Sequence, residues 1–153
     1  MTSEMTFNVE IEKASLAKRA SRYVPGGVRI LLGGAFFVFG LNGFLNFLPQ
    51  PTTPLPAGAT AFLGALMNTG YMFQLIAATQ LIVGTLLLAN RFVPLAITLL
   101  APFIVNSILF HVFLEPSGRP IAFVVAALEI YLAWSYREAF RPLLRVRAVP
   151  AER

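Results

Sequence analysis

The sequence predicts an all-α membrane protein, a bundle of four transmembrane helices, from three observations. First, 57% of the 153 residues are hydrophobic, only 12% are charged, and the mean hydropathy is +0.72. A soluble domain of this length could not bury so much apolar surface. Second, the apolar residues gather in four runs that are close to the length needed to cross a bilayer. Third, nearly all basic residues fall in the segments that would share one side of the membrane.

The first predicted span covers residues 30–48 and is interrupted only by Asn42 and Asn46. At about 1.5 Å per residue it reaches about 28 Å, which matches the hydrocarbon core of a bilayer. Residues 1–27 precede it as a lead that mixes apolar and basic side chains. This composition suits either an amphipathic helix on anionic lipid or a disordered segment, and the sequence leaves both readings open.

The second apolar region, residues 59–89, is too long for one span, because a single helix would measure about 46 Å against a core of about 30 Å. We expect a break between Asn68 and Gly70. Residues 71–89 then form the second span. Residues 59–67 form a short interfacial helix or a re-entrant piece, because they follow a proline-rich turn.

The third span is predicted at residues 92–114 and carries the polar side chains Asn106 and His111. The fourth is predicted at residues 121–136, with Glu129 as its charged exception. The links between the second, third and fourth spans are short, so these spans must be antiparallel neighbours. Residues 28–144 therefore form one four-span membrane domain.

The basic residues predict the orientation of the bundle. Of the 12 lysine and arginine residues, all but one lie before the first span, in the link after the second span, or in the C-terminal tail. The exception is Arg119, between the third and fourth spans. The positive-inside rule then places both termini in the cytoplasm, including a basic tail at residues 145–153. The basic pI of about 10.2 is thus an orientation signal and not a sign of nucleic-acid binding.

The composition excludes most site chemistry. There is no cysteine and no aspartate, and His111 is the only histidine. Disulfides, thiolate-bound metals, iron–sulfur clusters and haem held by two histidines of this chain are therefore excluded, and no metal site is predicted. We predict no catalytic residues and no intrinsic cofactor. Any redox role would therefore need a cofactor that comes from outside this chain.

The polar residues inside the spans are the candidate site. Counted by helical rise, the side chains of one layer lie about 9 to 14 Å below the outer end of their spans, and these are Asn42, Gln80, Asn106 and Glu129. By the same count Asn46, Gln74 and His111 lie shallower, about 3 to 5 Å from the outer ends. An ionisable group at this depth is costly, so Glu129 should face the interior and find a partner or become protonated. The candidate ligand-binding residues are Asn42, Asn46, Gln80, Asn106, His111 and Glu129.

Three interpretations of this polar layer stay open. The side chains could form hydrogen bonds between helices and so hold the bundle together, since helices in lipid have no hydrophobic force between them. They could line a pocket that opens to the outer leaflet, in which amides and His111 bind a carbonyl-bearing amphiphile such as a quinone, and Glu129 tunes or relays a proton. They could also line a path for a small solute or for protons.

Several segments together resemble the DoxX family of small four-span bacterial membrane proteins. These are the first-span end GLNGFLNFLP, the second-span stretch TGYMFQLIAATQLIVGTLLLANRFVPLA, the third-span stretch PFIVNSILFHVFL and the exit LEIYLAWSYREAFRPLL. The resemblance covers residues 28–144. It implies a subunit of a bacterial inner-membrane complex, associated with redox or quinone-linked partners and acting through a bound quinone or lipid.

A structural assembly subunit of a larger membrane complex and a small-solute or proton transporter remain the alternatives. The expected partners are membrane lipid and membrane proteins, with no nucleic acid, and the sequence leaves a homo-oligomer open.

Overall fold

A computed structural model describes residues 2–49 and 53–144 of the chain, and the regular structure within these ranges is entirely helical. The main helices are α1 Thr2–Leu45, α2 Ala57–Asn68, α3 Met72–Leu88, α4 Val93–Phe113 and α5 Arg119–Ser135. Three short elements complete the fold: η1 Pro116–Gly118, α6 Arg137–Phe140 and η2 Arg141–Leu144.

Three of the helical segments are long and apolar enough to cross a membrane, namely Tyr23–Leu45, Val93–Phe113 and Pro116–Ser135. Helices α2 and α3 form a pair that is bent by 90°, and the number of candidate spans becomes four if this pair counts as one span. The prediction of an all-α protein with apolar spanning helices is therefore confirmed at this level. The direction in which each helix crosses the membrane, with both termini in the cytoplasm, stays a prediction.

The helix boundaries differ from the predicted ones for local reasons. The first span ends at Leu45 and not at residue 48, because Asn46 adopts a left-handed conformation with φ of 49° and its N–H donates to the Asn42 carbonyl at 2.8 Å. The predicted break between Asn68 and Gly70 is confirmed, since α2 ends at Asn68 and Gly70 follows with φ of 75°. The short helix α2 exists as predicted, but its place at a membrane interface stays a prediction.

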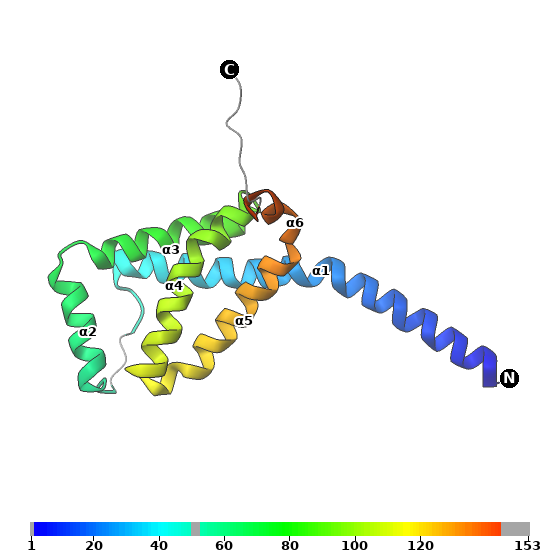
Figure 1. The fold of residues 1–153 in the computed structure, drawn as a ribbon, viewed down its shortest axis with the longest axis horizontal. Coiled ribbons are helices and arrows are strands. Elements are labelled where there is room, and N and C mark those ends of the chain that lie inside the picture. The colour runs from blue at the N-terminus through cyan, green and yellow to red at the C-terminus, as the bar shows by residue number, and fades with distance from the viewer. Residues whose placement is uncertain (1, 50–52, 145–153) are drawn as a thin grey trace, which may run out of the picture.

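The helices are arranged as two pairs that spread apart (Figure 1). Helix α1 packs most extensively against α3, and α4 packs against α5. The two pairs converge near α6 and diverge toward α2, which stands across the open side (Figure 1). We call these two regions the α6 end and the α2 end of the bundle.

Glycine residues allow α1 and α3 to touch backbone to backbone. A Cβ atom on Gly40 would lie 2.8 Å from the Cα of Leu81, and one on Gly84 would lie 2.6 Å from the Cα of Phe37. No other residue fits at such a distance, and small residues are the usual means by which membrane helices approach closely. This contact leads into the buried core at the α6 end, which is formed by Leu32, Phe36, Val83, Leu87, Val93, Ala96, Ile97, Leu100, Ile104, Ala126 and Leu132.

The N-terminal lead is helical, which answers the question that the sequence left open. Helix α1 is continuous from Thr2 through Pro25 into the first span, and its N-terminal half projects beyond the bundle (Figure 1). Contact of this half with a membrane surface stays a prediction. The predicted basic tail at residues 145–153 lies outside the described residues.

Candidate functional site

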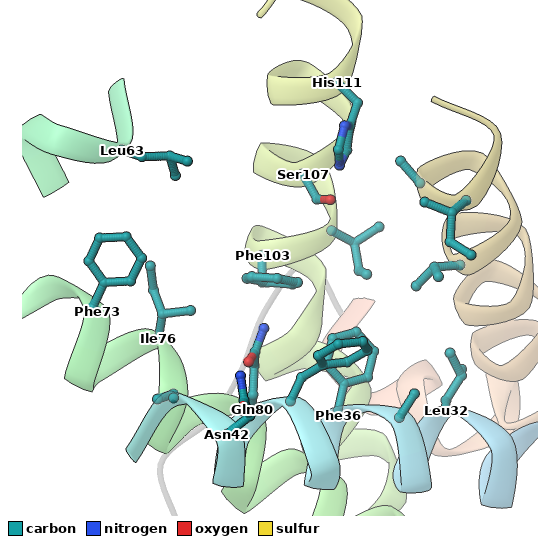
Figure 2. Close-up of a pocket in the computed structure, with 18 of the residues that line it drawn as sticks. Leu32, Phe36, Asn42, Leu63, Phe73, Ile76, Gln80, Phe103, Ser107 and His111 are labelled. Carbon is teal, nitrogen blue, oxygen red and sulfur yellow. The ribbon is translucent and has the colours of Figure 1, made fainter. Parts of the chain in front are cut away.

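A pocket of about 1050 Å³ lies between the two helix pairs, where they diverge. All five main helices contribute to its wall, and Figure 2 shows their side chains pointing into it. Most of the lining is apolar, with Leu32 and Phe36 on α1, Phe73 and Ile76 on α3, and Phe103 on α4. Six polar side chains interrupt it, and these are Asn42, Asn46, Gln74, Gln80, Ser107 and His111.

Two amides form a polar edge of the pocket on the α1–α3 pair. Asn42 on α1 and Gln80 on α3 lie next to each other in Figure 2. The Oδ1 atom of Asn42 already accepts the N–H of Leu48 at 2.7 Å, so this side chain also fastens the chain after the end of α1. Since an amide has both an acceptor and two donors, the Nδ2 group of Asn42 is left to serve the pocket.

His111 is the polar group of the opposite wall, and its ring is held by Glu115. The Nδ1 atom lies 2.9 Å from Glu115 Oε2 and 3.0 Å from the Glu115 carbonyl oxygen. Because both neighbours are acceptors, the proton of the neutral ring sits on Nδ1 and leaves Nε2 as an acceptor. The ring extends toward Ser107 and the cavity in Figure 2.

The carboxylate of Glu115 is fixed by donors at the start of η1. It accepts the hydroxyl of Ser117, the N–H of Ser117 at 3.2 Å and the N–H of Gly118 at 3.0 Å. The Ser117 hydroxyl, together with the Gly118 N–H and His111, lowers the pKa of Glu115 below its ordinary value, and partial desolvation opposes this only in part. Glu115 is therefore a charged acceptor that orients His111.

The segment after Glu115 presses on the same imidazole. A Cβ atom on Gly118 would lie 2.9 Å from His111 Nε2 and closer still to Nδ1 and Cε1, so only glycine leaves room for the ring. Arg119 then donates to the carbonyl oxygens of His111 at 3.1 Å and Val112 at 2.7 Å, which satisfies the C-terminal end of α4. The ring is thus confined on the edge that carries Nδ1 and Cε1.

The structure brings four of the six sequence-predicted site residues to this pocket: Asn42, Asn46, Gln80 and His111. Gln74, which the depth count placed in the shallower set, joins them. Sequence reasoning missed Ser107, which lies four residues before His111 and so on the same face of α4. That spacing was the signal that could have found it.

Asn106 is not in the pocket. It is exposed on α4 and does not belong to the pocket wall. Asn106 and His111 are five positions apart, which turns an ideal helix by about 140°, so the two side chains cannot share one cavity unless the helix register shifts. His111 occupies the pocket face, and Asn106 therefore points elsewhere.

Glu129 faces the interior as predicted, but without a partner. It is 7% exposed, and its Oε1 atom has no hydrogen-bond partner among the described residues. Asn106, Gln80 and His111, the partners that the sequence suggested, do not bond to it. Glu129 lies one helical turn beyond Val125, which lines the pocket, and therefore sits beneath the pocket on the side of the α6 end. Buried unpaired carboxyl oxygens are rare enough in folded proteins to need an explanation.

Compared with models of protein families, with curated proteins and with solved structures, the chain matches none of them. What stands is a small all-helical protein with three or four candidate membrane spans and one large, mostly apolar pocket among its described residues.

Proposed function

We propose that this chain is a four-span subunit of a bacterial cytoplasmic-membrane complex, and that it holds a quinone or a lipid in the pocket between its helix pairs. The pocket itself carries the proposal. Its volume of about 1050 Å³ lies at the upper end of the range of ligand pockets, and its mostly apolar wall with a few converging polar groups is the usual composition of such sites.

The lining suits an amphiphile. An apolar chain or ring would contact side chains such as Phe36 and Phe103, which meet edge to face with ring centroids 5.7 Å apart. A polar head would find an acceptor in Nε2 of His111 and donors in the amides of Asn42 and Gln80. A quinone offers carbonyl acceptors when oxidised and hydroxyl donors when reduced, so both of its states find complementary groups here.

The arrangement around His111 supports binding over a purely structural role. A histidine that only joined two helices would form its hydrogen bonds with the neighbouring helix. Here Nδ1 is bonded within the α4–η1 turn, and Nε2 has no protein partner among the described residues. An oriented ring with one available nitrogen at a cavity wall is a typical ligand-binding arrangement.

The charge distribution supports an orientation with both termini in the cytoplasm, because ten basic residues flank the bundle at its two termini and one more, Arg91, lies in the α3–α4 link. In this orientation the pocket lies toward the outer leaflet. The resemblance to DoxX-like segments supports a redox or quinone-linked complex as the context, in which the chain anchors its partners and has no catalytic activity of its own.

The test is mass spectrometry of small molecules that co-purify with the protein after mild solubilisation. We expect a quinone or a defined lipid at close to one molecule per chain. His111→Leu should lower this content at least tenfold, because the polar head loses its oriented acceptor. Thr98→Val is the matched control on the same helix, since the Thr98 hydroxyl bonds only to the Pro94 carbonyl at 2.9 Å.

Equal ligand content in the two variants would contradict the role of His111. If the wild-type protein carried no stoichiometric small molecule and co-purified only with large protein partners, the binding proposal would be lost. The purely structural assembly subunit would then be the better account.

A second candidate function, proton transfer across the membrane, is favoured by one observation, the unpartnered Glu129 beneath the pocket. Ionisable residues inside spans often mark proton paths. In proteoliposomes with an internal pH dye, Glu129→Gln should abolish proton flux, while Glu138→Gln, at an exposed ion pair, should not. Equal flux in both variants, or none in the wild type, would reject this candidate.

A further inference from the structure

Helix α4 carries an exposed stripe on a face that neither the pocket nor the core uses. Its members recur at alternating intervals of four and three residues, and they are Leu95, Leu99, Pro102, Asn106, Leu109 and Phe113. We call this stripe the α4 seam. All six residues are exposed, and the leucine and phenylalanine members range from 41% exposure at Leu99 to 75% at Phe113. Such spacing averages 3.5 residues and is the repeat by which two helices pack along their length.

Asn106 is the polar member at the centre of the seam, and it differs from the other polar groups of the helices. The hydroxyls of Thr79, Thr85 and Thr98 each bond to the carbonyl one turn earlier in their own helix, at 2.7 to 2.9 Å. The amides of α1 and α3 line the pocket. Within the described residues, the side chain of Asn106 makes no hydrogen bond and does not belong to the pocket wall, although it lies well inside the candidate span Val93–Phe113.

An unpaired amide on the outside of a spanning helix needs a partner, because lipid offers no hydrogen bonds. The partner must supply both a donor and an acceptor at the same depth. Pro102 also lies on this face, and it has no N–H to donate to the Thr98 carbonyl in the usual pattern of an α-helix. The seam is therefore matched better by a protein surface with polar groups than by an acyl chain.

We propose that the α4 seam is the contact surface for a second copy of this chain. All copies insert into a membrane with the same orientation, so a two-fold axis along the membrane normal brings the two α4 helices together parallel and in register. Each Asn106 then meets the same residue of the other copy. An amide is complementary to itself, because each side donates one N–H and accepts another.

The heptad position of Asn106 agrees with this arrangement. With the four-then-three spacing, Asn106, Leu99 and Phe113 occupy the a positions, and Leu95, Pro102 and Leu109 the d positions. A single asparagine at an a position is the device by which parallel helix pairs fix their register and oligomeric state. The pocket lies on another face of α4, with Phe103, Ser107 and His111, so pairing through the seam leaves the pocket intact. The proposal does not depend on what the pocket binds.

Disulfide crosslinking tests the proposal directly, because the chain has no cysteine of its own. Single variants Leu99→Cys, Leu109→Cys and Phe113→Cys of the full chain are oxidised in native membranes. We expect covalent dimers at these seam positions, at least fivefold more than for the exposed controls Ala101→Cys and Val124→Cys. Equal crosslinking at seam and control positions, or none at either, would overturn the proposal, and so would crosslinks that form only to a different protein.

The role of Asn106 has a separate test. Asn106→Leu keeps the seam apolar but removes the amide pair, and it should weaken dimerisation, measured by energy transfer in liposomes, by roughly threefold to thirtyfold. Asn106→Gln keeps an amide and should recover part of the affinity. An Asn106→Leu variant that dimerises as well as the wild type, or a wild type that is monomeric at every protein-to-lipid ratio, would contradict the proposal.

Discussion

Where α1 crosses α3, backbone meets backbone, whereas at the α2 end the two helix pairs are separated by a pocket of about 1050 Å³. The first region contains glycines where the two backbones approach most closely, and it buries apolar side chains almost completely. The second contains amides, a hydroxyl and an oriented histidine that have few partners in the protein. Membrane helices gain stability from close packing, so a region that gives up packing and gathers polar groups is more informative about function.

The largest expected effect concerns the packed region. Gly84→Ala places a Cβ atom 2.6 Å from the Cα of Phe37, so α1 and α3 must move apart along their contact. We expect the free energy of unfolding to fall by about 2 to 3 kcal/mol, as for overpacked cores. Thermal unfolding in detergent measures it, with Gly34→Ala as the control, because nothing lies within 4 Å of a Cβ there. An equal effect in both variants would contradict the backbone contact.

A substitution in the pocket should lower ligand binding and leave stability unchanged, in contrast to Gly84→Ala. Ser107→Leu adds an apolar side chain to the pocket wall without touching the core, so we expect the unfolding free energy to stay within about 0.5 kcal/mol of the wild type. The amount of co-purifying amphiphile, measured by mass spectrometry, should fall at least tenfold. A stable variant that retains its amphiphile would show that the ligand binds elsewhere.

The Glu115 turn predicts a pH dependence. Since the folded state lowers the pKa of Glu115 below its ordinary value of 4.5, the carboxylate stabilises the fold fully above that value, and the contribution is lost as pH falls through the lower folded value. The melting temperature of the wild type should therefore drop more steeply below pH 4.5 than that of Glu115→Gln. Glu138→Gln, in an exposed pair with Arg141, should keep the wild-type slope.

The smallest effect is expected at the end of α3. The guanidinium of Arg29 donates to the carbonyl oxygens of Leu87 and Leu88, which closes the last turn of α3 against α1. Arg29→Lys loses one of these two contacts and should cost about 1 kcal/mol in thermal unfolding. Arg91→Lys, at an exposed position in the α3–α4 link, is the control and should be neutral.

The sequence predicted the helices well because each is a run of apolar residues ended by turn residues. The break after α2 was visible in Asn68 and Gly70. The divergence of the two helix pairs was not visible, since it depends on where glycines meet partners from another helix.

The site was only partly predictable for the same reason. Helical rise predicts only the depth of a side chain along its span, whereas the direction of the side chain around its helix decides whether it reaches the pocket. Asn106 and Glu129 have nearly the same predicted depth as Gln80 yet lie outside the pocket wall. The bond between His111 and Glu115 was also missed, because it needs the tight turn of η1 after α4 to bring the carboxylate back to the ring.

The α2 end contains the pocket, whereas the α6 end is a buried core, so the two ends should differ in their access to small molecules. Single-cysteine variants test it directly, because the chain has no other thiol. Ser107→Cys, in the pocket, should react with a small membrane-permeant maleimide and should be protected by added quinone or lipid. Ile97→Cys, in the core on the same helix, should stay unreactive. Equal labelling at both positions, or labelling at Ser107→Cys that no amphiphile slows, would contradict the account.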